Sequence, residues 1–276
     1  MRRISGILLV WLTLAATLAG GELKAPIRIG FLADTHVNTR TNNRYVSYNT
    51  HFVKAIEAIN AAKVDLVLIS GDLTDNGSEE QMDRFKQMVK GFEAPVLFVP
   101  GNHDVGHAGS KETKMTISQK RLTLFRKKLG PDYFVRQVAG VRVIGMDSCV
   151  IGTGYKEENK QWTFLEKELG QPWREPTLLI AHYPLRRKTA DEPKNGVWNA
   201  HPDAQQRLIR LAKQGGARAV LTGHFHYPIE NRLEGILFLS ASATAFGVPR
   251  DKQATGWMLL TVPPEGEIQF QFEELE

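Results

Sequence analysis

Cysteine is almost absent from this sequence: among 276 residues there is one, Cys149. A single thiol excludes an intramolecular disulfide and any metal or redox motif built on paired cysteines. Cys149 lies within the apolar run of residues 141–151, which favours a buried, unreactive thiol. Catalysis by a cysteine nucleophile is therefore not expected.

The chain also lacks a strong excess of charge of one sign. It carries 35 Lys+Arg against 30 Asp+Glu, a net charge of +5, and the basic residues form no block. This pattern does not indicate specific nucleic-acid binding. The fractions of 42% hydrophobic and 24% charged residues are ordinary for a globular protein, and they exclude a disordered, collagen-like or polytopic membrane chain.

Only one long apolar run is present, residues 4–19, and it follows Arg2 and Arg3 and ends in small residues. This layout predicts a signal peptide over residues 1–20 and export to the periplasm or outside the cell. The alternative is an uncleaved anchor, but the run is short for a membrane span. No cysteine follows it, so a lipoprotein is not expected.

Short apolar runs alternate with amphipathic stretches in the rest of the chain. The short runs predict strands at residues 27–33, 66–70, 96–99, 135–138, 141–147, 177–181, 219–221 and 236–239, with a last strand in the tail 266–276. Helical spacing of apolar residues predicts helices around residues 52–59, 82–92, 117–129 and 162–169. The many charges of residues 117–129 are interpreted as a solvated face. Without an internal repeat or a linker, residues 25–276 are expected to form one α/β domain.

Most of the predicted strands run directly into polar residues. These segments are Asp34-Thr-His36, Gly71-Asp72, Gly101-Asn-His-Asp104, His182 and Gly223-His-Phe-His226. The carboxyl ends of strands in open α/β sheets meet at one crevice, where ligands bind. The sequence therefore brings carboxylates, an amide and several imidazoles to one site.

These residue types are suited to a metal centre. Imidazole and carboxylate ligands favour zinc, iron or manganese. Taken singly, each segment has an ordinary explanation: the first is a common chance pattern, Gly-Asp is a frequent turn, and the paired histidines of the last could be surface residues. The Gly-Asn-His-Asp segment is rarer, and all five at strand ends make coincidence very improbable.

In this order the segments resemble the calcineurin-like metallophosphoesterases, whose pattern DxH…GD…GNH[DE]…H…GHxH is met in full between Asp34 and His226. The resemblance implies an α/β fold, a four-layer αββα sandwich of two mixed β-sheets flanked by helices. The runs GVRVIGMDS and IAHYP look closest to the class III cyclic nucleotide phosphodiesterase branch.

The resemblance also implies roles for single residues, with two divalent or trivalent transition-metal ions (Fe, Mn or Zn) as cofactors. One metal would be held by Asp34, His36, Asp72 and His226, and the second by Asp72, Asn102, His182 and His224. His103 would stand beside the leaving group, oriented by the carboxylate of Asp75. Asp75 could instead be a turn residue, because it lies in the sequence Asp-Asn-Gly.

The expected activity is hydrolysis of a small phosphodiester or nucleotide-like phosphate ester by metal-activated water, since two cations neutralise the phosphoryl charge and lower the pKa of a bound water. The alternatives are a phosphomonoesterase on the same site and a non-catalytic scaffold or metal-binding protein. The segment Leu73-Thr74-Asp75 after Asp72 lacks the tyrosine ligand that purple acid phosphatases place there. Asn76 stands where the protein Ser/Thr phosphatases carry an arginine.

Substrate contacts are expected from the loops that follow the motifs. The candidates are Arg40, Arg44, His107 and Arg186, because guanidinium groups near a phosphate site bind anions. Each arginine has solvated loop charge as its alternative. Trp198 is either a stacking platform or a packing residue, and His51 and His201 are interpreted as hydrogen-bonded residues at helix edges.

Overall fold

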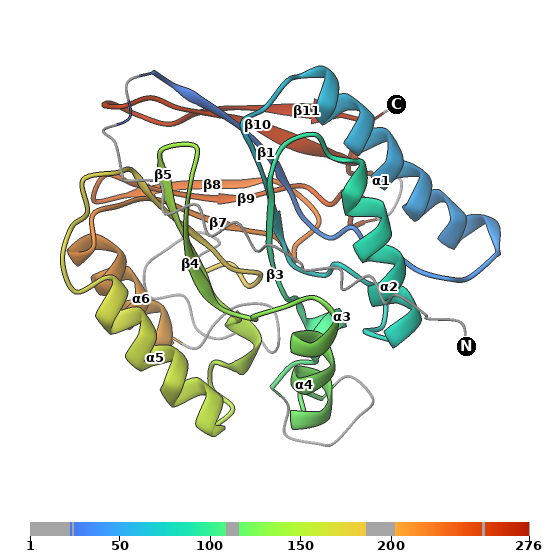
Figure 1. Ribbon diagram of the computed structural model, residues 1–276, viewed down its shortest axis with the longest axis horizontal. Helices are drawn as coiled ribbons and strands as arrows, with labels where there is room; N and C mark the ends of the chain where they lie inside the picture. The colour runs from blue at the N-terminus through green and yellow to red at the C-terminus, as the bar shows by residue number, and fades with distance from the viewer. Residues whose placement is uncertain (1–22, 24, 109–115, 186–201, 250–251, 276) are drawn as a thin grey trace, which may run out of the picture.

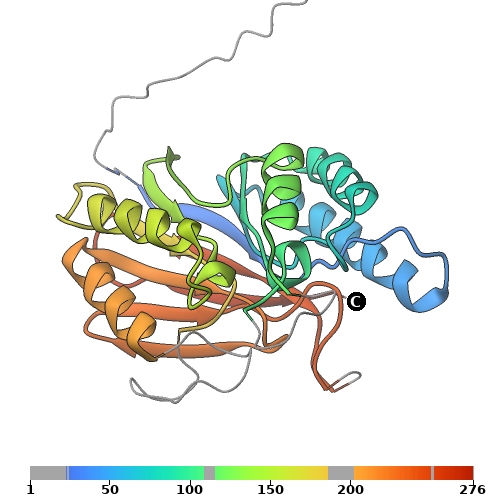
Figure 2. The same ribbon diagram turned by 90° about the horizontal axis from the view of Figure 1, so that it is seen from below.

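The computed structural model describes residue 23 and residues 25–108, 116–185, 202–249 and 252–275. Two mixed β-sheets lie face to face, and helices cover their outer faces (Figure 1). In Figure 2, α5 and α6 lie on one side of the molecule and α1, α2 and α4 on the other. The predicted α/β sandwich of two mixed sheets flanked by helices is confirmed.

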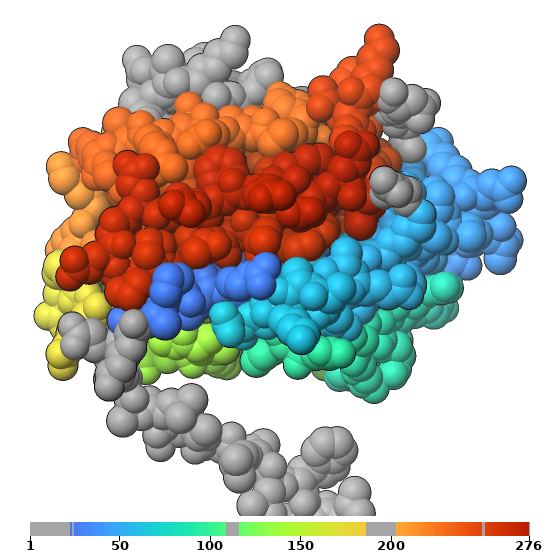
Figure 3. Space-filling view, turned by 90° about the horizontal axis from the view of Figure 1, so that it is seen from above, coloured from blue at the N-terminus to red at the C-terminus, as the bar shows by residue number. Residues whose placement is uncertain are grey.

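The first sheet has the strand order β11-β10-β1-β2-β3. Its strands are β1 (Ile27–Leu32), β2 (Leu66–Ser70), β3 (Val96–Val99), β10 (Gly256–Val262) and β11 (Gln269–Glu274). The strands β1, β2 and β3 are parallel, β10 pairs antiparallel with β1, and β11 pairs antiparallel with β10 at the edge of the sheet. Seen from above, the C-terminal strands (red) cross the middle of one face, with α1 (light blue) beside them (Figure 3).

The second sheet has the order β4-β5-β6-β7-β9-β8. Its strands are β4 (Phe134–Val138), β5 (Val141–Gly145), β6 (Thr177–Ile180), β7 (Ala217–Thr222), β8 (Ile229–Leu233) and β9 (Ile236–Ser240). The four inner strands are parallel, and antiparallel β4 and β8 close the two edges.

The helices connect the strands and bury one face each. They are α1 (Asn43–Ala61), α2 (Glu79–Met88), α3 (Asn102–Val105), α4 (Gln119–Lys128), α5 (Lys156–Glu168) and α6 (Pro202–Gln214), with 3₁₀ turns η1 (Val89–Gly91) and η2 (Ser148–Val150). Asn42 and Ser78 cap α1 and α2 by accepting main-chain N–H groups of the first turn. None of the helices in the described ranges has the length and apolar character that a membrane crossing requires.

Alternate side chains along each strand pack in two different hydrophobic cores. Residues such as Phe31, Leu68 and Ile180 point between the sheets and form one buried cluster. Their neighbours, such as Ile69 and Leu179, point outward and pack with helix residues in the other cluster. Both faces of the inner strands are buried, so consecutive residues in their sequences are apolar. These apolar runs end at the polar residues of the site.

Several predicted elements differ from the observed ones. The second predicted helix ends at Met88, so Phe92 lies beyond it, and the tail strand starts at Gln269. The strands β8 and β10 and the helix α6 are not among the predicted elements. Residues 1–20, predicted to be a signal peptide, lie outside the described residues.

Candidate metal centre

Two loops that follow β1 and β2 run side by side and carry the first ligands expected from the sequence. The N–H of Asp34 donates to the carbonyl of Gly71 (3.0 Å), and the N–H of His36 donates to that of Asp72 (2.9 Å). Asp34, His36 and Asp72 are buried. A side chain at Gly101 could not be accommodated, because its Cβ would collide with the main chain and carboxylate of Asp72.

The second sheet supplies the remaining imidazoles from the ends of β6 and β7. His182 and Asn102 lie together, with the Nε2 atom of His182 3.0 Å from Oδ1 of Asn102. The same Nε2 atom is 3.4 Å from Oδ2 of Asp72. His226 approaches Asp34 at 3.3 Å and His36 at 3.4 Å. The structure therefore brings all seven residues predicted as metal ligands to one place between the two sheets.

Three groups at this site have the spacing of metal ligands, and one of them combines His36 with Asp75 and His103. The other two consist only of predicted ligands. In one, the ligand atoms of Asp34, His36, Asp72 and His226 lie within 4.8 Å of one another. In the other, the same holds for Asp72, His182 and His224. Asp72 belongs to both groups, which is the position of a carboxylate that bridges two ions.

The orientation of the side chains fits metal binding. One oxygen of each carboxylate accepts a main-chain N–H: Oδ2 of Asp34 from His224 (2.9 Å) and Oδ1 of Asp72 from His103 (2.8 Å). The other oxygen of each faces imidazole nitrogens, and Oδ1 of Asp34 is buried without a hydrogen-bond partner in the described part of the chain. Converging acceptors of this kind are satisfied by a cation.

Main-chain carbonyls hold two of the histidines in the orientation that a metal needs. The Nδ1 atom of His182 lies 2.8 Å from the carbonyl of Ser70, and that of His226 lies 2.7 Å from the carbonyl of Phe246. A proton on Nδ1 leaves the lone pair on Nε2, which points into the cluster. The surrounding backbone thus selects the tautomer that binds metal.

The backbone at the ligands is itself unusual. Five of the seven predicted ligands have positive φ angles, namely Asp34 (54°), His36 (42°), Asp72 (46°), His224 (76°) and His226 (61°). Non-glycine residues seldom adopt this conformation, and where it occurs it clusters at functional sites. The turns place each ligand side chain inward directly after a strand.

Charges within the site shift the pKa values of its residues strongly in the protein without metal. Burial disfavours the charged form of His182, but the Asp72 carboxylate outweighs this effect and raises the pKa of His182 to about 9. Burial, assisted by the charge of His182, lowers the pKa of His224 to about 3. A protonated His182 therefore offsets the carboxylate charge, and a metal ion would replace that proton.

His103 differs from the other imidazoles because substrate can reach it. Its side chain is 33% exposed, and its Nε2 atom lies 4.0 Å from Oδ2 of Asp72. Its Nδ1 atom lies 2.6 Å from the main-chain carbonyl of Asp75. The sequence predicted that the Asp75 carboxylate orients His103. The structure gives this place to the carbonyl, and the carboxylate pairs with Arg40 at 3.3 Å.

The other candidates for substrate contacts lie at different distances from the cluster. The guanidinium of Arg40 stacks on the ring of Tyr45 at 4.2 Å beside Asp75. Arg44 lies in the first turn of α1, and its Nε–H donates to the hydroxyl of Tyr48 (3.1 Å). The ring of His107 bonds the carbonyl of Ala108 within its own loop. Arg186, Trp198 and His201 lie outside the described residues.

Two residues that sequence analysis did not single out, Arg121 and Phe246, support the site together with Asp104, which it named only as part of a motif. Arg121 of α4 donates to the carbonyls of His103 (2.7 Å) and Asn76 (3.1 Å), which corrects the view that the charges of this helix are all solvated. The carboxylate of Asp104 accepts the N–H of Leu73 in the loop after β2 and the N–H of Gly101 after β3. The ring of Phe246 lies 4.4 Å from that of His226.

The interpretations of two other residues are confirmed: Cys149 is buried, and His51 bonds the carbonyl of Ala245.

Comparison with known proteins gives the same assignment. The sequence profile described as "Calcineurin-like phosphoesterase" matches residues 27–228, which include every motif. The chain belongs to the calcineurin-like phosphoesterase family. It is thus a metal-dependent phosphoric ester hydrolase of a family with a dimetal site, and the residues clustered between its sheets could bind such ions.

Curated relatives align over most of their length. A probable glycerophosphodiester phosphodiesterase GpdQ of Arcobacter nitrofigilis is 29% identical over 259 residues, 88% of each chain. A 3′,5′-cyclic adenosine monophosphate phosphodiesterase CpdA of Haemophilus influenzae is 24% identical over 274 residues, 92% of each chain. A probable cyclic nucleotide phosphodiesterase of Rhodococcus erythropolis is 30% identical over 230 residues, 78% of this chain and 70% of the relative. The resemblance to the cyclic nucleotide phosphodiesterase branch is confirmed.

Solved structures support the fold. A dimetal phosphatase from Danio rerio superimposes with a TM-score of 0.58 at 11% identity, covering 88% of this chain and 98% of that one. The purple acid phosphatase PPD1 of yellow lupin gives a TM-score of 0.62 at 14% identity, covering 90% of this chain and 51% of that one.

Proposed function

We propose that this metallophosphoesterase prefers small phosphodiesters to phosphate monoesters. The observation that carries the proposal is the turn after Asp72. Its Asn76, which replaces the arginine of the Ser/Thr phosphatases, bonds the N–H of Ser78 through its side chain (3.0 Å). The charge of nearby Arg40 is already paired with Asp75. A monoester dianion requires more positive charge than a diester monoanion, so these contacts favour the diester.

The names of the relatives support the same preference. The proteins of Arcobacter nitrofigilis, Haemophilus influenzae and Rhodococcus erythropolis are named as diesterases of glycerol or cyclic nucleotide esters. We extend this class to the present chain as its small phosphorylated substrate.

We assign proton donation to His103. Its Nδ1–H donates to the carbonyl of Asp75, so Nε2 is directed toward the cluster. Burial lowers the pKa of His103, but the Asp72 carboxylate and the Asp75 carbonyl raise it to a net value above its usual range. A protonated Nε2 near the substrate is suited to give its proton to the leaving oxygen.

The ligand atoms of the site also limit which metal ions it can bind. Imidazole nitrogens, carboxylates and an amide oxygen are suited to iron, manganese or zinc, and we propose two ions from this set. When bound, such ions neutralise phosphoryl charge and lower the pKa of a coordinated water. Asp72 would bridge them, with Asn102, His182 and His224 on one side and Asp34, His36 and His226 on the other.

The proposal is tested with protein loaded with each metal and supplied with bis(4-nitrophenyl) phosphate or 4-nitrophenyl phosphate. We expect the higher kcat/KM for the diester and loss of activity on chelation. A strong preference for the monoester would make the protein a phosphatase. Absence of turnover with both substrates at full metal content would favour the non-catalytic alternative.

We further propose that the protein is exported and loses residues 1–20. The support is the apolar run of residues 4–19 after Arg2 and Arg3. Intact-mass measurement of protein from a cell that makes it should give a chain that starts near Gly20 or Gly21. A soluble protein that retains Met1 would contradict the proposal.

A further inference from the structure

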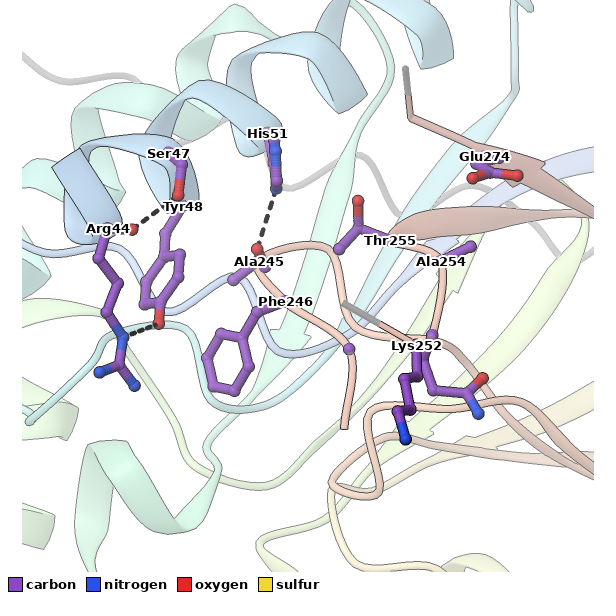
Figure 4. A pocket seen from close by; sticks show the side chains of 12 residues that line it. Arg44, Ser47, Tyr48, His51, Ala245, Phe246, Lys252, Ala254, Thr255 and Glu274 are labelled. Atoms are coloured by element: carbon purple, nitrogen blue, oxygen red, sulfur yellow. Dashed lines mark hydrogen bonds between the residues drawn. The ribbon is translucent and has the colours of Figure 1, made fainter. Parts of the chain in front are cut away.

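A cavity of about 700 Å³ opens beside the metal centre (Figure 4). One wall is the first half of α1, and the other is the chain before β10 together with Glu274 at the end of β11. Phe246 belongs to both places, because it lines the cavity and its ring lies 4.4 Å from His226 and 5.0 Å from His36. A substituent on a phosphate at the metal centre therefore needs to pass only one aromatic ring to enter the cavity.

The size and walls of the cavity suit a polar group larger than a methyl or phenyl ester. Pockets for nucleoside-sized ligands have volumes of roughly 300–1,000 Å³. Ser47, Gln253 and Thr255 line it with polar side chains, and His51 is turned to the carbonyl of Ala245 (2.9 Å). Tyr48 stacks on Phe246 with ring centroids 4.8 Å apart, which holds Phe246 in place.

Two cations, Arg44 and Lys252, line the cavity from different walls. Neither forms an ion pair with a carboxylate of the described chain. The guanidinium of Arg44 is held by the hydroxyl of Tyr48 (3.1 Å), which leaves its remaining N–H groups available to an anion. The lining includes one carboxylate, Glu274, which Figure 4 shows on the side away from Arg44.

We propose that this cavity binds a second phosphate group carried by the alcohol part of the substrate, which the charges of Arg44 and Lys252 on its two walls attract. The inference rests on the proposed function, in which the scissile phosphate lies at the metal centre. It adds a substrate class: phosphate esters that bear two phosphates separated by a sugar-sized spacer. Cations that form no ion pair with a carboxylate of the described residues, beside a site for one phosphate, are expected to recognise another.

The test uses two nitrophenyl esters that differ by one group. They are thymidine 5′-(4-nitrophenyl phosphate) and the same ester with a 3′-phosphate. Wild-type protein should show a kcat/KM about three- to tenfold higher for the 3′-phosphorylated ester, the range of exposed charge-assisted contacts. The double variant Arg44→Gln/Lys252→Gln should bring the ratio of the two kcat/KM values close to one. Raising the salt from about 50 mM to about 500 mM should reduce the wild-type ratio, because the contacts are exposed.

The matched control is Lys160→Gln on α5, which removes an exposed positive charge outside the cavity lining and should leave the ratio as in wild type. An equal preference in wild type and the double variant would overturn the proposal and assign the selectivity to the metal centre. A wild-type ratio near one would also overturn it.

A binding measurement separates this inference from the proposed function. Calorimetry with metal-loaded protein compares thymidine 3′,5′-bisphosphate with thymidine 5′-monophosphate, and neither needs to be hydrolysed. Tighter binding of the bisphosphate in wild type, lost in the double variant, supports the cavity even if bis(4-nitrophenyl) phosphate is not a substrate. Equal affinity for the two ligands refutes it even if that diester is hydrolysed.

Discussion

The imidazole of His103 is oriented by the main chain of Asp75 and not by its carboxylate. The Nδ1 atom lies 2.6 Å from the carbonyl oxygen, while the carboxylate forms an ion pair with Arg40. A carbonyl cannot take up a proton, so it keeps Nδ1 protonated and Nε2 directed to the site throughout the reaction. Asp75 therefore has two separable roles, one for each part of the residue.

Asp75→Asn should separate these roles. The variant keeps the carbonyl, so kcat for bis(4-nitrophenyl) phosphate should stay within about threefold of wild type. The KM should fall about two- to fivefold, because the charge of Arg40 is then no longer paired and can attract the anionic substrate. Steady-state kinetics give both constants. A fall in kcat of a hundredfold would instead show that the carboxylate itself takes part in catalysis.

His103→Ala should be most harmful when the leaving group is poor. A general acid contributes about 10²–10⁴-fold, and an activated nitrophenolate needs little of this help. We therefore expect a large loss of kcat/KM for an alkyl ester and a much smaller loss for bis(4-nitrophenyl) phosphate. Equal losses on the two substrates would indicate phosphate binding by His103 instead of proton donation.

Asp72→Ala should remove metal as well as activity. The carboxylate lies 3.4 Å from Nε2 of His182 and 3.8 Å from that of His36, so its loss affects both ligand groups. His103→Ala, which alters neither group, should retain more metal. Elemental analysis of the purified variants gives the ratio of metal to protein. Activity of the native protein that survives complete chelation would refute the metal hypothesis.

Asp104→Asn should destabilise the fold. The carboxylate accepts N–H groups of Leu73 (3.0 Å), Thr74 (2.9 Å) and Gly101 (2.8 Å) and the hydroxyl of Thr74 (2.6 Å). An amide would direct its NH₂ at buried donors, at a cost of about 2–4 kcal/mol in the free energy of unfolding.

Urea denaturation measures this change. The control is Asp83→Asn, whose side chain is 53% exposed and pairs with Lys128, and which should cost less than about 1 kcal/mol. Similar effects of the two substitutions would mean that the hydrogen bonds of Asp104 do not hold the loops together.

Asp147→Asn should change how stability depends on pH. Burial, with a smaller effect of Asp132, raises the pKa of Asp147 to about 8. The folded state then holds a proton that the unfolded state has lost at pH values above about 4. Stability should fall as the pH rises from about 4 to about 8, by at most about 1.4 kcal/mol per pH unit.

The asparagine variant keeps the acceptor for the N–H of Cys149 but has no proton to lose. The free energy of unfolding of the variant, measured by urea titration, should therefore increase relative to that of wild type as the pH rises from about 5 to about 8. Parallel curves for the two proteins would show that Asp147 ionises normally.

The site was predictable because polar ligands interrupt apolar strands. Asp34, Asp72 and His182 each follow a buried strand directly, and a parallel sheet collects strand ends at one edge. To predict that these side chains point into the site, only the two-residue period of a strand and the short motifs were needed. The set of candidate ligands was thus predictable from the sequence alone. The experiments above test whether these residues bind metal.

Other features could not be read in this way. Arg121 lies in a basic helix, and nothing in its neighbours distinguishes it from a solvated charge until α4 is placed beside the His103 loop. Phe246 is a single aromatic residue in a loop, without periodicity. The edge strand β8 has mixed polarity, whereas the apolar run of β10 and the helical spacing in α6 were signals available to sequence analysis.

The left-handed turns at Asp34, His36, Asp72, His224 and His226 have an evolutionary consequence. Each of these conformations costs about 1–3 kcal/mol for a residue other than glycine. A descendant that no longer needed hydrolysis would therefore gain stability by placing glycine at these turns. Once hydrolysis is no longer needed, the ligands at these turns should consequently be replaced quickly, while the fold is kept.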